Sequence, residues 1–169
     1  VDAHADVNDE MFGERETHGT VFRRAYEEGL IVPEKVFQIG LRGTGYTAYD
    51  FTEAAGWGLN QHLAHEFWHK SLTPLAADIK AKIVNHKTYI SYDIDSLDPS
   101  FAPGTGTPEI GGLTTMQAME LIRGLRGLNI VGCDMVEVSP PYDTSGNTAL
   151  TAANLMFELL SILPNVPYR

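Results

Sequence analysis

The chain has 169 residues, of which 43% are hydrophobic, and 22 acidic against 12 basic side chains give a formal net charge of -10. A chain of this length can bury the core of one globular domain, and its negative charge disfavours nucleic acid as a partner while it suits metal cations or a cationic ligand. No apolar run approaches the roughly eighteen residues of a membrane-spanning helix, and the single cysteine, Cys133, excludes a disulfide framework and is expected in the core.

Short β-branched runs alternate with longer amphipathic stretches, and this alternation predicts β-α units in one α/β domain with a parallel sheet. In chain order we expect a helix over 20–28, a strand over 35–41, a helix over 48–55, a strand over 59–63, a helix over 74–84, a strand over 87–92, a helix over 115–125, a strand over 128–136 and a helix over 148–163. Gly29 is expected to close the first helix and Pro74 to open the third. Thr114 and Gln117 are expected to form a capping box.

The beginning of the chain does not fit a complete sheet. Val1 leads directly into Asp2-Ala-His-Ala-Asp6, so that a first strand would already be ending at residue 2. Such a sheet leaves backbone unpaired and one face uncovered. We therefore expect that an N-terminal part of the domain is missing or belongs to a separate chain.

Two clusters of side chains have the spacing of metal ligands. Asp2, His4 and Asp6 recur at every second residue, which on an extended backbone turns all three to one side. Asp93 and Asp95 repeat this spacing after a predicted strand. Because parallel sheets bind ligands at the carboxyl ends of their strands, the two clusters can meet in one crevice.

The chemistry of these clusters favours a metal centre over ordinary turn residues. Either cluster alone is as well explained by turn-forming aspartates and a hydrogen-bonded histidine. Four carboxylates brought together repel one another, however, unless cations such as two divalent ions neutralise them. Oxygen-rich ligands with one imidazole and no thiolate favour manganese or a similar ion over structural zinc.

Longer blocks of sequence resemble a known family. They are Asp2-Ala-His-Ala-Asp6, Ser91-Tyr-Asp-Ile-Asp-Ser-Leu-Asp-Pro99 with Gly104-Thr-Gly-Thr-Pro108, and Asp134-Met-Val-Glu-Val-Ser-Pro-Pro141. They are similar to the signatures of the ureohydrolases, the family of arginases and agmatinases, over nearly the whole chain. The blocks at 17–24, 38–43 and 146–150 are closest to the agmatinase and guanidino-acid hydrolase branch. The resemblance implies a three-layer α-β-α fold with a mainly parallel sheet, and a homo-oligomer, either a trimer or a hexamer.

The resemblance also implies roles for individual residues. Five ligands of a binuclear manganese site would be Asp2, His4, Asp6, Asp93 and Asp95. Asp2 and Asp93 resemble the bridging pair, and the sixth ligand, a histidine, is expected upstream of this chain. His18 resembles the histidine that passes a proton to the leaving amine, Glu137 the carboxylate that pairs with the guanidinium, and Asn8 a residue near the far end of the substrate.

The function implied is hydrolysis of a linear guanidino compound, agmatine or an acid such as 4-guanidinobutanoate, to urea and an amine. A guanidinium resists neutral water, so a hydroxide bridging two Mn²⁺ ions is the expected nucleophile. The alternative is a catalytically silent subunit that acts in an oligomer, which the absent sixth ligand motivates. Similarity to animal agmatinase-like enzymes implies mitochondria, but the sequence leaves both this location and the cytoplasm open.

Two short motifs compete with this interpretation. His65-Glu-Phe-Trp-His69 matches the zinc-peptidase pattern, in which both histidines and Glu66 lie on one helix, but a strand is predicted just before it and a helix only after it. Residues 43–48 imitate a dinucleotide-binding turn, although tyrosines crowd it and a loop is the better interpretation. Finally, Arg42 is a candidate for contact with a neighbouring subunit, and Tyr142 and Asp143 for lining a pocket.

Overall fold

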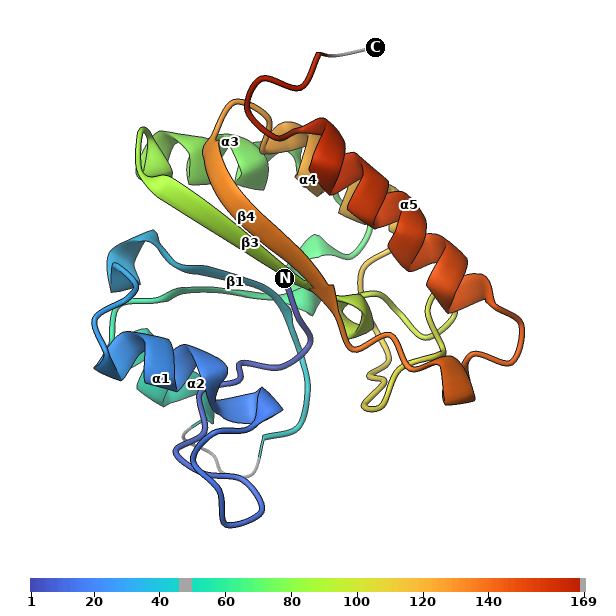
Figure 1. The fold of residues 1–169 in the computed structure, drawn as a ribbon, viewed down its shortest axis with the longest axis horizontal. Helices are drawn as coiled ribbons and strands as arrows, with labels where there is room; N and C mark the ends of the chain where they lie inside the picture. Colours follow the sequence, from blue (N-terminus) through green and yellow to red (C-terminus); the bar gives the residue numbers. More distant parts are fainter. Residues whose placement is uncertain (46–49, 168–169) are drawn as a thin grey trace.

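The computed structural model describes residues 1–45 and 50–167 (Figure 1). Its helices and strands are α1 (Val21–Glu27), β1 (Phe37–Leu41), α2 (Asp50–Gly56), β2 (Asn60–Leu63), α3 (Thr73–Ile83), β3 (Lys87–Asp93), α4 (Thr115–Gly124), β4 (Asn129–Val136) and α5 (Asn147–Ser161). This alternation confirms the predicted α/β class, and the start of the helix predicted over 48–55 lies outside the described residues. Among the helices that the structure describes, none has the length and apolar character to cross a membrane.

The strands form two parallel pairs, β1 with β2 and β3 with β4. The first residues of the chain lie between these pairs, as Figure 1 shows. Val1 N donates to Ser91 O at 2.9 Å, and Asp93 N donates to Val1 O at the same distance. On the other side, Asp2 N donates to Ile39 O of β1 at 2.9 Å. The N-terminal backbone therefore joins the two pairs and brings Asp2 to the carboxyl end of β3.

Helices cover both sides of the strands. The larger hydrophobic cluster packs α3, α4 and α5 against β3 and β4, with Tyr92, Leu121 and Leu155 among its fully buried side chains. A smaller cluster lies under α1 and α2, on the other side of the strands in Figure 1. This arrangement confirms the three layers. Cys133 is only half-buried at the edge of the larger cluster, where burial raises the pKa of its thiol.

The expected helix boundaries are present. Gly29, with φ of +67°, follows the end of α1, and Pro74 lies in the first turn of α3. Thr114 N donates to Gln117 Oε1 at 3.0 Å, and Gln117 N donates to Thr114 Oγ1 at 3.2 Å. These contacts satisfy N–H groups that a helix start leaves unpaired.

Tyr142 and Asp143, the two candidates for lining a pocket, do not line the cavity of the candidate site described below. Asp143 accepts hydrogen bonds from the backbone N–H groups of Thr148 and Ala149, at 3.1 and 2.8 Å, and so caps α5. The side chain of Tyr142 is 64% exposed. Capping of α5 is enough to explain an aspartate at position 143.

The zinc-peptidase geometry is absent from the segment that carries its motif. After β2, residues Ala64–Phe67 form a short 3₁₀ turn, and His69 has φ of +58°. His65 and His69 are therefore not one turn apart on the same α-helix, which that motif requires.

Candidate metal centre

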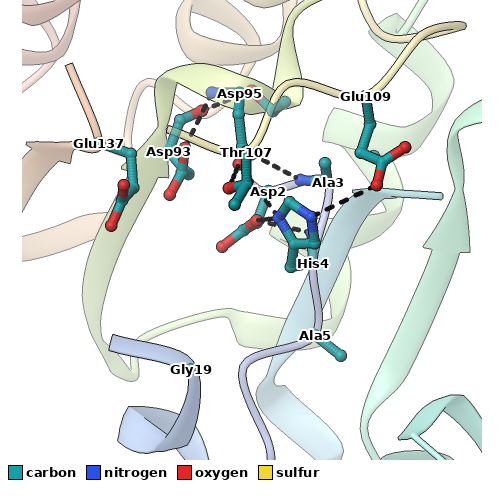
Figure 2. Close-up of polar contacts among 12 residues, drawn as sticks. Asp2, Ala3, His4, Ala5, Gly19, Asp93, Asp95, Thr107, Glu109 and Glu137 are labelled. Carbon is teal, nitrogen blue, oxygen red and sulfur yellow. Dashed lines mark hydrogen bonds and ion pairs between the residues drawn. The ribbon is translucent and has the colours of Figure 1, made fainter. Parts of the chain in front are cut away.

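Asp2, His4 and Asp95 converge at the point where the N-terminal segment meets the end of β3. Each offers one ligand atom, and these atoms lie within 4.8 Å of one another. His4 Nδ1 is 3.0 Å from Asp95 Oδ2 and 3.6 Å from Asp2 Oδ1 (Figure 2). Asp2 and Asp95, 93 positions apart in the sequence, thus belong to one group of potential metal ligands, because residues 1–3 pair with both β1 and β3.

Backbone N–H groups hold the carboxylates of this group in place. Asp2 Oδ1 accepts from His4 N at 2.7 Å, Asp95 Oδ1 from Ala3 N at 3.2 Å, and Asp93 Oδ1 from Asp95 N at 2.8 Å. Each carboxylate is therefore oriented by the chain itself before any ligand binds.

The remaining predicted residues gather around one cavity of about 310 Å³. Its lining includes His4, Asp6, Asn8, His18, Asp93, Asp95 and Glu137. His18 Nδ1 lies 3.9 Å from Glu137 Oε1, and Asn8 Nδ2 donates to Gly19 O at 3.2 Å. Asp2 adjoins this cavity through its contacts with His4. The structure thus brings the five predicted ligands together with His18, Glu137 and Asn8 into one region. Of the five ligands, only Asp2, His4 and Asp95 form a group within 4.8 Å among the described residues.

Burial and mutual repulsion shift the pKa values of these groups. Burial, followed by repulsion from neighbouring carboxylates, raises the pKa of Asp6 to about 8 and that of Asp93 to about 10, and burial also raises the pKa of Asp2. Hydrogen bonds to Asp2 and Asp95 raise the pKa of His4 to about 10. For Asp95, burial acts in the opposite direction, but the contact with His4 outweighs it and the pKa is lowered.

These shifts describe a donor set that fits divalent cations. A protonated His4 pairs with Asp95 and so compensates one carboxylate. Among the described residues neither Asp6 nor Asp93 forms an ion pair, and the pKa of each is raised because burial disfavours the charged carboxylate. A purely structural ion pair would need only His4 and Asp95. Asp2, Asp6 and Asp93 are further carboxylates in the same place. Cations with more charge than one imidazolium would be needed to compensate them.

Two acidic residues of the cavity have an unusual backbone conformation. Glu137, just after β4, has φ of +63°, and Asp6 has φ of +52°. This left-handed region costs a residue other than glycine on the order of 1–2 kcal/mol of conformational free energy. Such strain concentrates at functional sites, where the surrounding fold imposes it. The backbone conformation of these two residues therefore lowers the stability of the folded chain.

Two side chains of the site were missed by the sequence reasoning. Thr107 Oγ1 donates to Asp95 Oδ2 at 3.2 Å, and Glu109 Oε1 lies 3.8 Å from His4 Nε2 (Figure 2). If Nδ1 bound a metal ion, a carboxylate on this side of the ring would hold the remaining proton on Nε2. Both residues belong to or follow the block at 104–108, which was noted only for its resemblance.

The loop that imitates a dinucleotide-binding turn contributes to the same site. A Cβ atom on Gly43 would overlap the imidazole of His4, so this glycine makes room for a side chain and not for a pyrophosphate. Residues 46–48 of that motif lie outside the described residues.

Comparison with known proteins gives consistent matches. The model of the arginase family matches residues 1–161. The chain is 60% identical to guanidinobutyrase of Pseudomonas aeruginosa, over 100% of this chain and 53% of that protein, and 54% identical to mitochondrial agmatinase of Gallus gallus, over 98% and 49%. The solved structure of proclavaminate amidino hydrolase from Streptomyces clavuligerus superposes with a TM-score of 0.88 and 42% identity, over 94% of this chain and 53% of that one. The chain thus spans about half the length of these relatives.

Proposed function

Since the chain belongs to the arginase family, we propose that it provides active-site residues of an enzyme that hydrolyses a linear guanidino compound and releases urea. The observation that carries this proposal is the meeting of Asp2, His4 and Asp95 beside a cavity that Glu137 also lines. Relatives named guanidinobutyrase and agmatinase support the class of substrate.

Two metal ions complete the proposed site. Enzymes of the arginase family are binuclear metalloenzymes, usually with manganese. The residues that would hold two Mn²⁺ ions are Asp2, His4, Asp6, Asp93 and Asp95. When bound, the ions would neutralise these carboxylates and would activate water for attack on the guanidinium carbon.

The chain's own side chains would bind the substrate and move a proton. The carboxylate of Glu137 offers two oxygens to a planar guanidinium, a match for paired hydrogen bonds. His18 lies on the 3₁₀ turn His18–Thr20 with its side chain 55% exposed, 3.9 Å from Glu137. It can therefore exchange a proton with solvent and deliver it to the departing nitrogen, so that the C–N bond breaks to give urea and a neutral amine. Asn8 would contact the tail of the substrate.

The proposed substrates are agmatine and 4-guanidinobutanoate. The names of the Pseudomonas and Gallus relatives refer to these two kinds of compound, and only the Gallus name refers to mitochondria. A trimer or hexamer of identical chains stays a prediction.

Urea release tests the proposed function. The protein is incubated with agmatine, 4-guanidinobutanoate or arginine, with and without Mn²⁺, and urea is measured. We expect release from agmatine or 4-guanidinobutanoate that depends on Mn²⁺, and little from arginine. Stoichiometric Mn²⁺ binding without urea from any of the three would instead support the silent interaction subunit.

Replacing Glu137 by glutamine is expected to separate substrate binding from metal binding. The amide keeps the shape of the side chain but loses the charge that pairs with the guanidinium. Because a hydrogen bond to a charged group contributes about 1.5–3 kcal/mol, we expect kcat/KM to fall about 10- to 150-fold. Mn²⁺ affinity should stay near the wild-type value. Glu28→Gln, an exposed position at the end of α1, is the matched control. Unchanged kinetics in Glu137→Gln would contradict the assigned role.

A further inference from the structure

The guanidinium of Arg42, just after β1, binds an unusual number of backbone carbonyl groups. Its Nε, Nη1 and Nη2 atoms donate to six carbonyl oxygens, those of Gly40, Asp95, Ser96, Leu97, Glu109 and Ile110. All three nitrogens are thus engaged within the chain. Arg42 therefore has an internal role, and its contact with a neighbouring subunit stays a prediction.

These carbonyl groups come from three segments that surround the metal centre. The first is the end of β1, through Gly40 O at 3.1 Å. The second is the turn after β3, through Asp95 O at 2.8 Å. The third is the loop after residue 104, through Glu109 O at 2.7 Å. Arg42 is the one side chain among the described hydrogen bonds that links all three segments to each other.

Two of these segments carry side chains that contact His4. Asp95 Oδ2 lies 3.0 Å from His4 Nδ1, and Glu109 Oε1 lies 3.8 Å from His4 Nε2. The imidazole is therefore placed between two carboxylates whose own backbone carbonyls are both held by Arg42 (Figure 2 shows both carboxylates beside the ring).

Glycines make room for this arrangement. A Cβ atom on Gly112 would overlap the guanidinium of Arg42 and the backbone nitrogen of Asp98. Gly40 has φ of +101°, and the register of β1 against β2 shifts between Ile39 and Leu41 around it. This local irregularity lies at the carbonyl group that Arg42 binds.

We propose that Arg42 is a positioning residue of the metal centre, which fixes the backbone of Asp95 and of Glu109 and thereby the ligand geometry around His4. The proposal rests on the proposed metal-dependent function. Arg42 contacts none of the proposed ligand side chains in these hydrogen bonds, so it acts through the main chain. Its planar fork of five N–H groups suits several carbonyl oxygens at once, which the three N–H groups of a lysine ammonium cannot match.

The test compares Arg42→Lys and Arg42→Met with wild type. Lysine keeps the charge, and methionine keeps much of the length. Arg123→Met is the matched control, because Arg123 lies on α4 in an ion pair with Glu158 at 2.6 Å. Mn²⁺ binding is measured from the electron paramagnetic resonance signal of free Mn²⁺, at a temperature where circular dichroism shows each variant folded. Hydrogen exchange of the metal-free proteins is followed over 93–97 and 105–113.

We expect the Mn²⁺ affinity of Arg42→Lys to fall about 10- to 100-fold, the range typical of residues that orient metal ligands. We also expect faster hydrogen exchange in those two segments and wild-type behaviour in Arg123→Met. Arg42→Met should show the same losses or larger ones.

Each other result counts against the proposal. A dissociation constant for Mn²⁺ within twofold of wild type would overturn it, and so would exchange that is unchanged in both segments. If Arg42→Lys does not fold at all, Arg42 supports the whole fold and not the site, which also overturns it. Wild-type protein that binds no Mn²⁺ would reject the proposed function instead, while hydrogen exchange would still decide whether Arg42 holds the two segments.

Discussion

Replacing Asp93 by alanine is expected to remove urea release almost entirely. Asp93 is 4% exposed and lies at the end of β3, where repulsion from Asp2 and Asp95 adds to the effect of burial on its pKa. As a proposed ligand, it would help to hold the metal ions. Because both ions contribute several kcal/mol of transition-state stabilisation, we expect turnover to fall at least about 10³-fold. Mn²⁺ stoichiometry, measured by metal analysis after gel filtration, should fall below two per chain.

The loss should not arise from unfolding, and Asp93→Asn tests this. In the metal-free protein the pKa of Asp93 is raised to about 10, so near pH 8 the unfolded chain releases a proton that the folded chain retains. Asparagine does not ionise, so Asp93→Asn removes this pH-dependent loss of folding free energy. We therefore expect metal-free Asp93→Asn to melt at or above the wild-type temperature while it loses the stabilisation by Mn²⁺. Asp78→Asn, at an exposed position of α3, is the matched control. Retention of two ions in Asp93→Asn would argue against the assignment.

The second large effect is a steep dependence of Mn²⁺ affinity on pH. Asp6 and Asp93 have pKa values raised to about 8 and about 10, and His4 has one raised to about 10. Ions must displace these protons before they bind. We therefore expect the logarithm of the association constant for Mn²⁺ to rise with pH between 6 and 9 with a slope above about one, which corresponds to release of more than one proton. Calorimetry in buffers of different ionisation enthalpy measures the protons released.

The stability of the metal-free protein should change in the opposite direction. For the two carboxyl groups, the folded state holds protons that the unfolded state releases above about pH 4, so their contribution becomes less favourable as pH rises to about 8 for Asp6 and about 10 for Asp93. The contribution of His4 is complete below about pH 6.5 and is lost as pH rises through about 10. We thus expect the melting temperature to fall from pH 6 to pH 10 without metal. Affinity for Mn²⁺ that does not vary with pH would contradict this account.

The local features of the site could be predicted from the sequence because they depend on neighbouring residues. A spacing of two residues brings Asp2 and His4 together in the structure, whereas Asp6, with φ of +52°, lies outside their group of ligand atoms. The capping box at Thr114 and Gln117 likewise needs only three residues of separation. The order of strands and helices follows from hydrophobic periodicity in the same way.

The sequence by itself determined the α/β class, the order of strands and helices along the chain, and the potential metal ligands Asp2, His4 and Asp95. The tertiary structure decided which groups meet across long stretches of chain. Glu109 reaches His4, and Arg42 binds the backbone of both Asp95 and Glu109, only because the N-terminal residues pair with β1 and β3 and the loop after residue 104 folds back over them. The physical reason is that local spacing sets the direction of a side chain, whereas packing of distant segments sets its partner. An aspartate in a segment after a strand can therefore become a helix cap, as Asp143 does, or part of a metal centre, as proposed for Asp95, and the residue type is the same in both.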